Sequence, residues 1–134
     1  MKRLMFLFLL AFAVNSCSTD DGETSQEVLL PIQSVIMPDS YLLNNIATIQ
    51  VSYKRPTDCH IFNGFQIDTN DKDSRIGIKA LKFDQPNCMS DDESLYEFPL
   101  NWTPTEVGTY TFRFWTGNDS AGVPQYITHE VVVE

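Results

Sequence analysis

Basic residues are scarce in this chain. Its 134 residues include 9 Lys and Arg against 18 Asp and Glu, a formal net charge of −9, and no base occurs between Arg3 and Lys54. Binding of nucleic acid needs a basic patch or stripe that faces the phosphates. The composition therefore predicts no nucleic-acid partner.

Motifs of catalysis and metal binding are also missing. The two histidines, His60 and His129, lie far apart in sequence, and no Gly-x-Ser-x-Gly nucleophile motif occurs. Segment 68–73 lacks the glycine and the later bidentate acid of a calcium loop, so we expect a hairpin turn there, and the acids of 90–94 are a weaker calcium candidate. We predict no enzyme, no metal and no cofactor; an enzyme would need a pocket that gathers acids from Asp91, Asp92 and Glu97.

Long apolar runs are absent after the N-terminus. Lys2 and Arg3 precede an 11-residue apolar run, 4–14, which is followed by Asn15, Ser16 and Cys17. About 20 residues are needed to span a bilayer, so this run is typical of a cleaved export signal. We predict a signal peptide over 1–16 and a lipid on Cys17; the alternative is an ordinary secretory signal that leaves Cys17 as a free thiol.

An acidic segment follows the anchor cysteine. Residues 17–27 contain four acids and no base, a composition that predicts a flexible tether. Its opening, Cys-Ser-Thr-Asp-Asp, resembles the surface-exposed lipoproteins of Bacteroidota-type cells. The resemblance implies an outer-membrane lipoprotein on the cell surface; the alternative is an acidic spacer on a lipoprotein that faces the periplasm.

Residues 28–134 read as one all-β domain. Short runs of alternating apolar and polar residues are separated by turn residues, with no apolar period of 3.6. The predicted strands are 28–37, 46–54, 61–67, 75–83, 95–102, 108–116 and 125–133. About seven antiparallel strands in a domain of this size predict an immunoglobulin-like β-sandwich.

Two details refine this fold. Gly108-Thr109-Tyr110 opens the penultimate strand, where such sandwiches place a tyrosine whose hydroxyl bonds backward to the main chain. Phe112 stands where antibody domains carry their second cysteine, so that disulfide is excluded. With Cys17 assigned to the lipid, Cys59 and Cys88 remain as a predicted disulfide; the alternative is two free thiols.

A longer resemblance covers residues 55–133. The elements that carry it are Arg55-Pro56, Cys59, Phe62-Asn63-Gly64-Phe65, Cys88, the run 104–115, and Gly117-Asn118-Asp119. They resemble a set of small uncharacterised lipoproteins of the same type of cell. The resemblance implies a fold and a place in the cell envelope, and it implies no activity.

Two features are candidates for binding. The loop 117–122, with Asn118 and Asp119, joins the last two predicted strands at the tip of the sandwich; the alternative is a plain hairpin connection. Within it, Asp119-Ser120-Ala121 resembles an acceptor for O-glycosylation, which would place a glycan on Ser120. The second feature is a set of aromatic residues, Trp102, Trp115, Tyr126 and Phe62.

Trp115 is the strongest candidate of this aromatic set. It alternates with Phe112 and Phe114, so we expect it to face away from the core, where it would stack on a sugar or anchor a protein; the alternative is a tryptophan that covers a neighbouring strand. We predict a lipid-anchored binding or accessory protein of the cell envelope that contacts another envelope protein. The alternative function is a glycan-binding module that helps to capture carbohydrate.

Overall fold

The structure is a computed structural model that describes residues 24–134. Eight strands form two sheets, and no helix in this range is long and apolar enough to cross a membrane. The strands are β1 (Ser25–Leu30), β2 (Ile32–Ile36), β3 (Ala47–Tyr53), β4 (His60–Asn70), β5 (Asp73–Phe83), β6 (Tyr96–Trp102), β7 (Gly108–Asn118) and β8 (Pro124–Val133). The predicted signal peptide and Cys17 lie outside the described residues.

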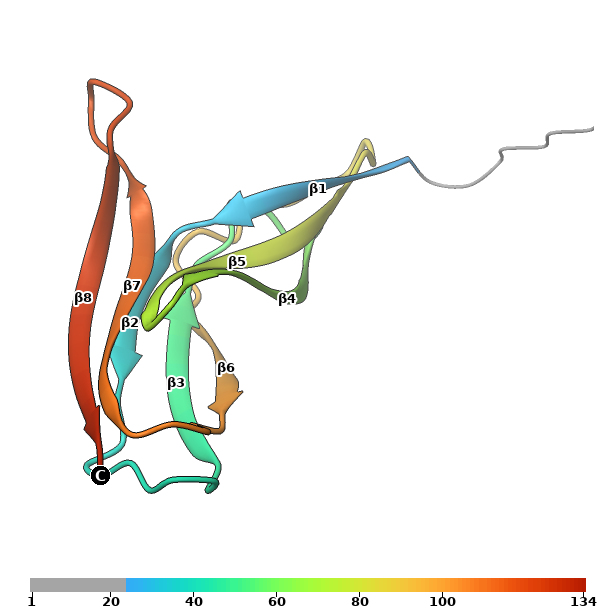
Figure 1. The fold of residues 1–134 in the computed structure, drawn as a ribbon. Coiled ribbons are helices and arrows are strands. Elements are labelled where there is room, and N and C mark those ends of the chain that lie inside the picture. The colour runs from blue at the N-terminus through green and yellow to red at the C-terminus, as the bar shows by residue number, and fades with distance from the viewer. Residues whose placement is uncertain (1–23) are drawn as a thin grey trace, which may run out of the picture.

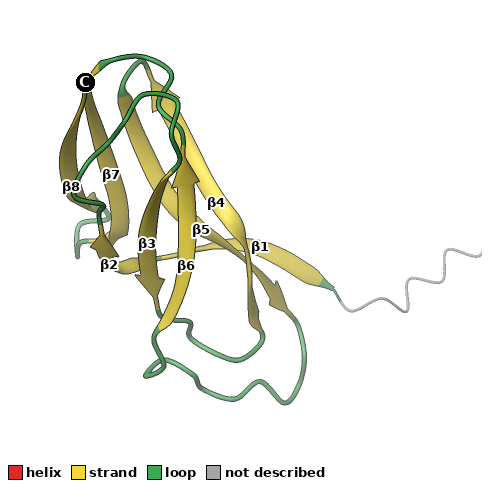
Figure 2. Cartoon of the chain, turned by 90° about the horizontal axis from the view of Figure 1, so that it is seen from below, coloured by secondary structure: helices red, strands yellow, loops and turns green. Residues whose placement is uncertain are grey.

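The two sheets face each other as a sandwich, which confirms the predicted fold class. One sheet contains β1, β4, β5, β7 and β8, and the other contains β2, β3 and β6 (Figure 1, Figure 2). Alternate side chains of both sheets point between them, as the pattern predicts. The buried core includes Ile49, Val51, Tyr53, Ile76, Ile78, Ala80, Phe112 and Phe114.

The first predicted strand, 28–37, is wrong in one respect, because it is two strands. Pro31 separates β1, which pairs with β5, from β2, which pairs with β3 in the other sheet (Figure 1). Proline has no N–H for a sheet ladder, so it suits the point where the chain leaves one sheet for the other. The strand β1 begins at Ser25, so the segment 17–27 predicted as a tether overlaps it.

The prediction of antiparallel strands fails at one pair. Along one edge, β5 pairs in parallel with β7 from Asp73 to Ile76, and from Ile78 onward the same edge pairs antiparallel with β1. Gly77 lies between the two pairings. Because β1 and β7 come to β5 from opposite ends, the sheet has no continuous third strand beside Gly77.

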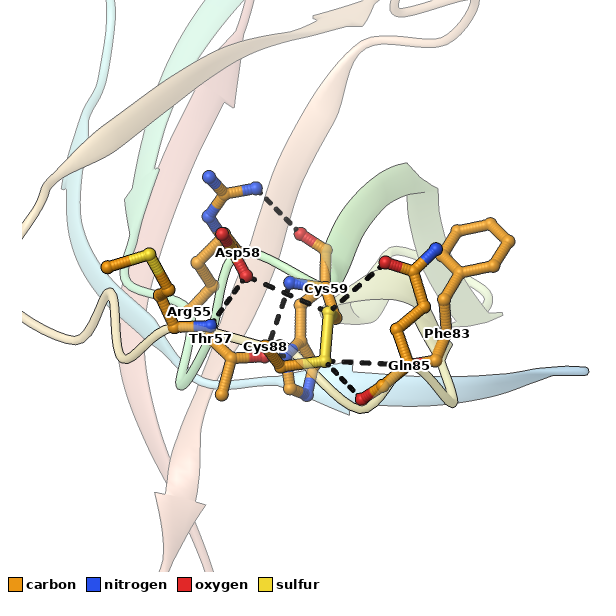
Figure 3. Close-up of a disulfide and its surroundings, with 9 residues drawn as sticks. Arg55, Thr57, Asp58, Cys59, Phe83, Gln85 and Cys88 are labelled. Atoms are coloured by element: carbon orange, nitrogen blue, oxygen red, sulfur yellow. Dashed lines mark hydrogen bonds between the residues drawn. A yellow bond between two sulfur atoms is a disulfide. The ribbon is translucent and has the colours of Figure 1, made fainter. Parts of the chain in front are cut away.

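Two predicted details of the fold are confirmed. The Tyr110 hydroxyl donates to the carbonyl oxygen of Glu106 at 2.8 Å. Cys59, immediately before β4, and Cys88, in the loop after β5, form a disulfide, with an S–S distance of 2.07 Å and a Cα–Cα distance of 5.6 Å (Figure 3). The disulfide ties the loop between β5 and β6 to the five-stranded sheet.

Candidate functional site

A cleft of about 320 Å³ lies on the outer face of the five-stranded sheet, the face turned away from the second sheet. We call it the Trp115 cleft. It is lined by Leu29, Gln66, Asp68, Arg75, Ile76, Gly77, Trp115, Asn118, Pro124 and Tyr126. Its size is in the range of small-molecule sites, and its lining mixes aromatic rings with a few polar groups, as such sites do.

Strand register explains why these side chains meet. Residues paired across adjacent strands point to the same face of a sheet. Trp115 pairs with Tyr126, so both rings stand on the outer face. Gln66 pairs with Gly77 and Asp68 pairs with Arg75, so β4 and β5 supply the polar side of the same surface.

Gly77 lies on the floor of the cleft. The parallel pairing of β5 with β7 ends at Ile76 and Phe114, so Gly77 is level with Trp115, one residue farther along. A Cβ atom added at Gly77 would lie 3.7 Å from Leu29 Cδ2, which is ordinary van der Waals contact. The missing side chain and the divergence of β1 from β7 together leave the hollow.

The Trp115 ring is held in a defined orientation. Its Nε1–H donates to Asn118 Oδ1 at 3.1 Å. A β-bulge follows, between Trp115 and Gly117, and Gly117 has φ of +112°, a conformation that other residues rarely adopt. The bulge and this hydrogen bond fix the indole, and the indole N–H is already satisfied within the protein.

Three polar side chains of the cleft have no partner in the part of the chain that the structure describes. Among residues 24–134, no hydrogen bond or ion pair involves the side chain of Gln66, Asp68 or Arg75, and all three are exposed. An amide, a carboxylate and a guanidinium together offer donors and acceptors for hydroxyl groups. Water molecules can hydrogen-bond to these groups at a small cost in free energy, and a ligand can displace them.

Asp119 lies in the β7–β8 turn, where the sequence predicts it, and its carboxylate is hydrogen-bonded within that turn. Its Oδ1 accepts from the backbone N–H groups of Ala121 and Val123, both at 2.9 Å, so the carboxylate organises the β7–β8 turn. It is not among the residues that line the Trp115 cleft, whereas Asn118 is. Ser120 is exposed in this turn, and its glycosylation stays a prediction.

The four aromatic candidates divide between the core and the cleft. Phe62 stacks on Phe98 with ring centroids 3.7 Å apart, and Trp102 meets Phe112 edge to face at 4.9 Å, so both pack against the core. Trp115 and Tyr126 line the cleft instead. The expectation that Trp115 faces away from Phe112 and Phe114 is therefore confirmed.

The polar residues of the cleft were not identified from the sequence. Gln66, Asp68 and Arg75 are exposed polar positions of a hairpin, and nothing local distinguishes them from other such positions. Their significance depends on the pairing of β5 with β7, whose partner residues such as Asp73 and Thr111 are 38 positions apart, and this pairing brings Trp115 beside them. The alternation of apolar and polar residues along the hairpin predicts that Arg75 and Asp68 lie on the outer face of the sheet. It does not predict that the Trp115 ring lies beside them.

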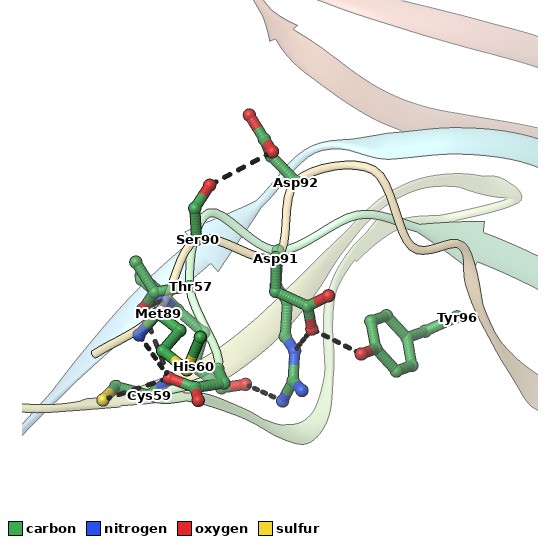
Figure 4. Close-up of polar contacts among 10 residues, drawn as sticks. Thr57, Cys59, His60, Met89, Ser90, Asp91, Asp92 and Tyr96 are labelled. Carbon is green, nitrogen blue, oxygen red and sulfur yellow. Dashed lines mark hydrogen bonds and ion pairs between the residues drawn. The ribbon is translucent and has the colours of Figure 1, made fainter. Parts of the chain in front are cut away.

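A second polar cluster lies near the disulfide, and its groups are paired. Asp91 accepts hydrogen bonds from Tyr96 Oη and from Arg55 Nε, the latter at 2.6 Å (Figure 4). The hydrogen bond from Tyr96, followed by that from Arg55, lowers the pKa of Asp91 to about 2. Arg55 also donates to the carbonyl oxygen of His60 at 3.0 Å. This cluster joins the β5–β6 loop to β4 and β6.

Two of the other metal and acid candidates, His60 and Glu97, have partners among the described residues. Thr57 Oγ1 lies 2.9 Å from His60 Nδ1, and the Glu97 carboxylate accepts from Ser52 Oγ at 3.3 Å. Asp58 lies close to both sulfur atoms of the disulfide, but a sulfur bonded in a disulfide is not a thiolate ligand.

The Trp115 cleft thus offers an oriented aromatic face beside unpaired hydrogen-bonding groups. Such an arrangement binds a ligand that has both an apolar face and several hydroxyl groups. A comparison with known proteins finds no matching family model, no matching curated protein and no matching solved structure. The chemistry of the cleft is therefore the basis for a functional assignment.

Proposed function

We propose that this protein binds carbohydrate in the Trp115 cleft and does not turn it over. The observation that carries the proposal is the placement of Trp115 and Tyr126 beside the unpaired side chains of Gln66, Asp68 and Arg75. This is the glycan-binding alternative of the sequence prediction, and the cleft favours it over a flat protein contact.

The chemistry of a sugar ring matches this lining. A pyranose ring presents C–H groups on its faces and hydroxyl groups around its edge. The C–H face stacks on an indole, which buries apolar area without the loss of a hydrogen bond. The edge hydroxyls donate to Asp68 and accept from Arg75, while Gln66 does both.

We place this activity at the cell envelope through the lipid on Cys17. The strand β1 starts at Ser25, eight residues after Cys17, so the start of the domain lies within about 29 Å of the anchor even when the link is fully extended. Stable anchoring takes more than one acyl chain. Cys17→Ser should abolish both fatty-acid labelling and membrane retention; continued labelling of the variant would refute the anchor.

The cleft is tested by measuring carbohydrate binding directly. The protein without the predicted signal peptide and lipid is screened against a glycan array. Each glycan that binds is then titrated by calorimetry into the wild-type, Trp115→Ala and Ile61→Ala proteins. Ile61 is an exposed apolar residue on the same sheet face that does not line the cleft. Loss of a stacked aromatic should weaken binding at least about tenfold, or about 1.4 kcal/mol.

Ile61→Ala should bind as wild type does. Equal binding by the Trp115→Ala and wild-type proteins would remove the cleft from the site. A bound oligosaccharide incubated with the protein should keep its length on chromatography, and cleavage abolished by a single Asp or Glu change would replace the binding function with an enzymatic one.

Contact with another envelope protein is a second candidate, supported by a different surface. Leu42 and Val132 are exposed, at 58% and 57%, and both line a hollow of about 510 Å³ between the loop after β2 and the end of β8. Exposed apolar side chains around a hollow favour protein association. Leu42→Asp should reduce cross-linking to a partner and leave carbohydrate binding unchanged; unchanged cross-linking would reject this surface.

A further inference from the structure

A second hollow adjoins the Trp115 cleft on the same face. It measures about 190 Å³ and is lined by Asp68, Asn70, Asp73 and Arg75. Asp68 and Arg75 line both hollows. The two hollows therefore adjoin at Asp68 and Arg75, and we call them together the β4–β5 groove.

The groove is longer than one sugar ring. Its ends are marked by two cross-strand pairs, Gln66 with Gly77 and Asn70 with Asp73, which are four residues apart on each strand. At about 3.4 Å per residue, this separation is about 14 Å. A ligand that fills the groove is therefore a chain of several sugar units.

The two ends of the groove differ in chemistry. Trp115 and Tyr126 stand at the end near Gly77, whereas the far end is lined by amide, carboxylate and guanidinium groups. One ring of a sugar chain would stack at the aromatic end. Hydroxyl groups of a later unit would bond to Asn70 and its neighbours at the polar end.

Charges in the groove are balanced. Asp73 is already paired with Arg113, with Nε to Oδ1 at 3.0 Å and Nη2 to Oδ2 at 3.2 Å. Asp68 faces Arg75 as its register partner. The whole chain is acidic, with a net charge of −9, which opposes a polyanionic ligand.

Building on the proposed function, we propose that the β4–β5 groove binds several consecutive units of a neutral polysaccharide. The aromatic end supplies most of the affinity, and the polar end makes affinity depend on chain length.

Chain length is the variable that tests this proposal. Wild type, Asn70→Ala and Ile61→Ala are titrated by calorimetry with cello-, xylo-, manno- and malto-oligosaccharides of one to six units, and with oligogalacturonate as the anionic counterpart. In the ladder that binds, affinity should rise at least about tenfold from the monosaccharide to the tetrasaccharide and then level off. Oligogalacturonate should bind at least about tenfold more weakly than the neutral ladder.

Asn70→Ala should lower the ratio of tetrasaccharide affinity to disaccharide affinity, while Ile61→Ala should keep the wild-type ratio. Equal affinity for monosaccharide and tetrasaccharide, an unchanged ratio in Asn70→Ala, or a preference for oligogalacturonate would overturn the groove and leave carbohydrate binding intact. Absence of binding to every ladder and to the glycan array, by a protein with a native melting transition, would overturn both proposals.

Discussion

Two regions of this molecule differ in whether their polar side chains have hydrogen-bond partners among the described residues. Beside the disulfide, the Arg55 guanidinium donates to Asp91 and to a backbone carbonyl, and its Cζ lies 4.7 Å from the centroid of the Tyr96 ring. In the Trp115 cleft, Arg75 and Asp68 face each other and have no partner among the described residues. The first region is organised by contacts within the chain, and the second is free to make contacts with a ligand.

The difference separates a structural role from the proposed binding role. Both regions contain an arginine, an aspartate and an aromatic ring, so residue types alone do not distinguish them. Arg55 and Asp91 are each only 19% exposed at the side chain, and removal of either leaves the other partly buried charge without its ion-pair partner. Arg75 is exposed to water, and its removal leaves no such group.

The largest expected effect concerns the disulfide beside the paired cluster. Cys59 and Cys88 are 29 positions apart, and in the loop-closure model their bridge stabilises the fold by about 3.6 kcal/mol. We expect the double change to Ala to lower the free energy of unfolding by about this amount in urea titrations. An unchanged urea midpoint would show that the paired region does not need the crosslink.

The next prediction compares the two arginines directly. Arg55→Ala should lower the free energy of unfolding by about 2 kcal/mol, because it removes charged hydrogen bonds from a partly buried site. Arg75→Ala should change it by no more than about 0.5 kcal/mol and should weaken carbohydrate binding. Equal losses of stability, measured by urea denaturation, would erase the distinction between the two regions.

A smaller effect is expected when the cleft is filled. The Cβ of Gly77→Ala has room at ordinary contact distance, and Gly77→Val extends farther into the hollow. We expect Gly77→Val to reduce carbohydrate affinity about tenfold, or about 1.4 kcal/mol, with no fall in the urea midpoint. Gly77→Ala is the matched control and should lose less affinity; equal binding by all three proteins would place the ligand elsewhere.

The smallest expected effect is the acid response of the paired region. The pKa of Asp91 is lowered from 3.8 to about 2, so its contribution to stability is present above about pH 4 and is lost as the pH falls through 2. The stability difference between wild type and Asp91→Asn should therefore shrink from pH 5 to pH 2. Glu93→Gln, at an exposed position of the same loop, is the control, and a difference that does not depend on pH would contradict this role.

Sequence patterns predicted features that depend on near neighbours along the chain. Alternation in 47–53 places Ile49 and Val51 in the core, and the Gly-Thr-Tyr of β7 marks the tyrosine whose hydroxyl bonds back to Glu106. The same logic placed Trp115 on the outer face. Local rules failed at Pro31, because the apolar run on both sides reads as one strand and nothing in it shows a change of sheet.

The hydrogen bonds of the Asp119 carboxylate are another feature that the sequence does not predict. Its place in an exposed loop is typical of a recognition residue, yet its carboxylate accepts two backbone N–H groups of its own turn. An aspartate that caps a turn and one that binds a ligand look alike in sequence. Asn118, the neighbouring residue, has a different role, because its side chain orients the indole of Trp115.

The sequence by itself determined the all-β class, the inward and outward sides of the strands, and the cysteine pair. These follow from the two-residue period of a strand and from the number of cysteines, which are local or compositional properties. Tertiary structure alone decided that β5 exchanges β7 for β1 at Gly77. That exchange brings Trp115 beside Arg75. The sequence alone does not predict it, because strand pairing between distant segments depends on packing of the whole core and not on the residues that the pairing exposes on the outer face.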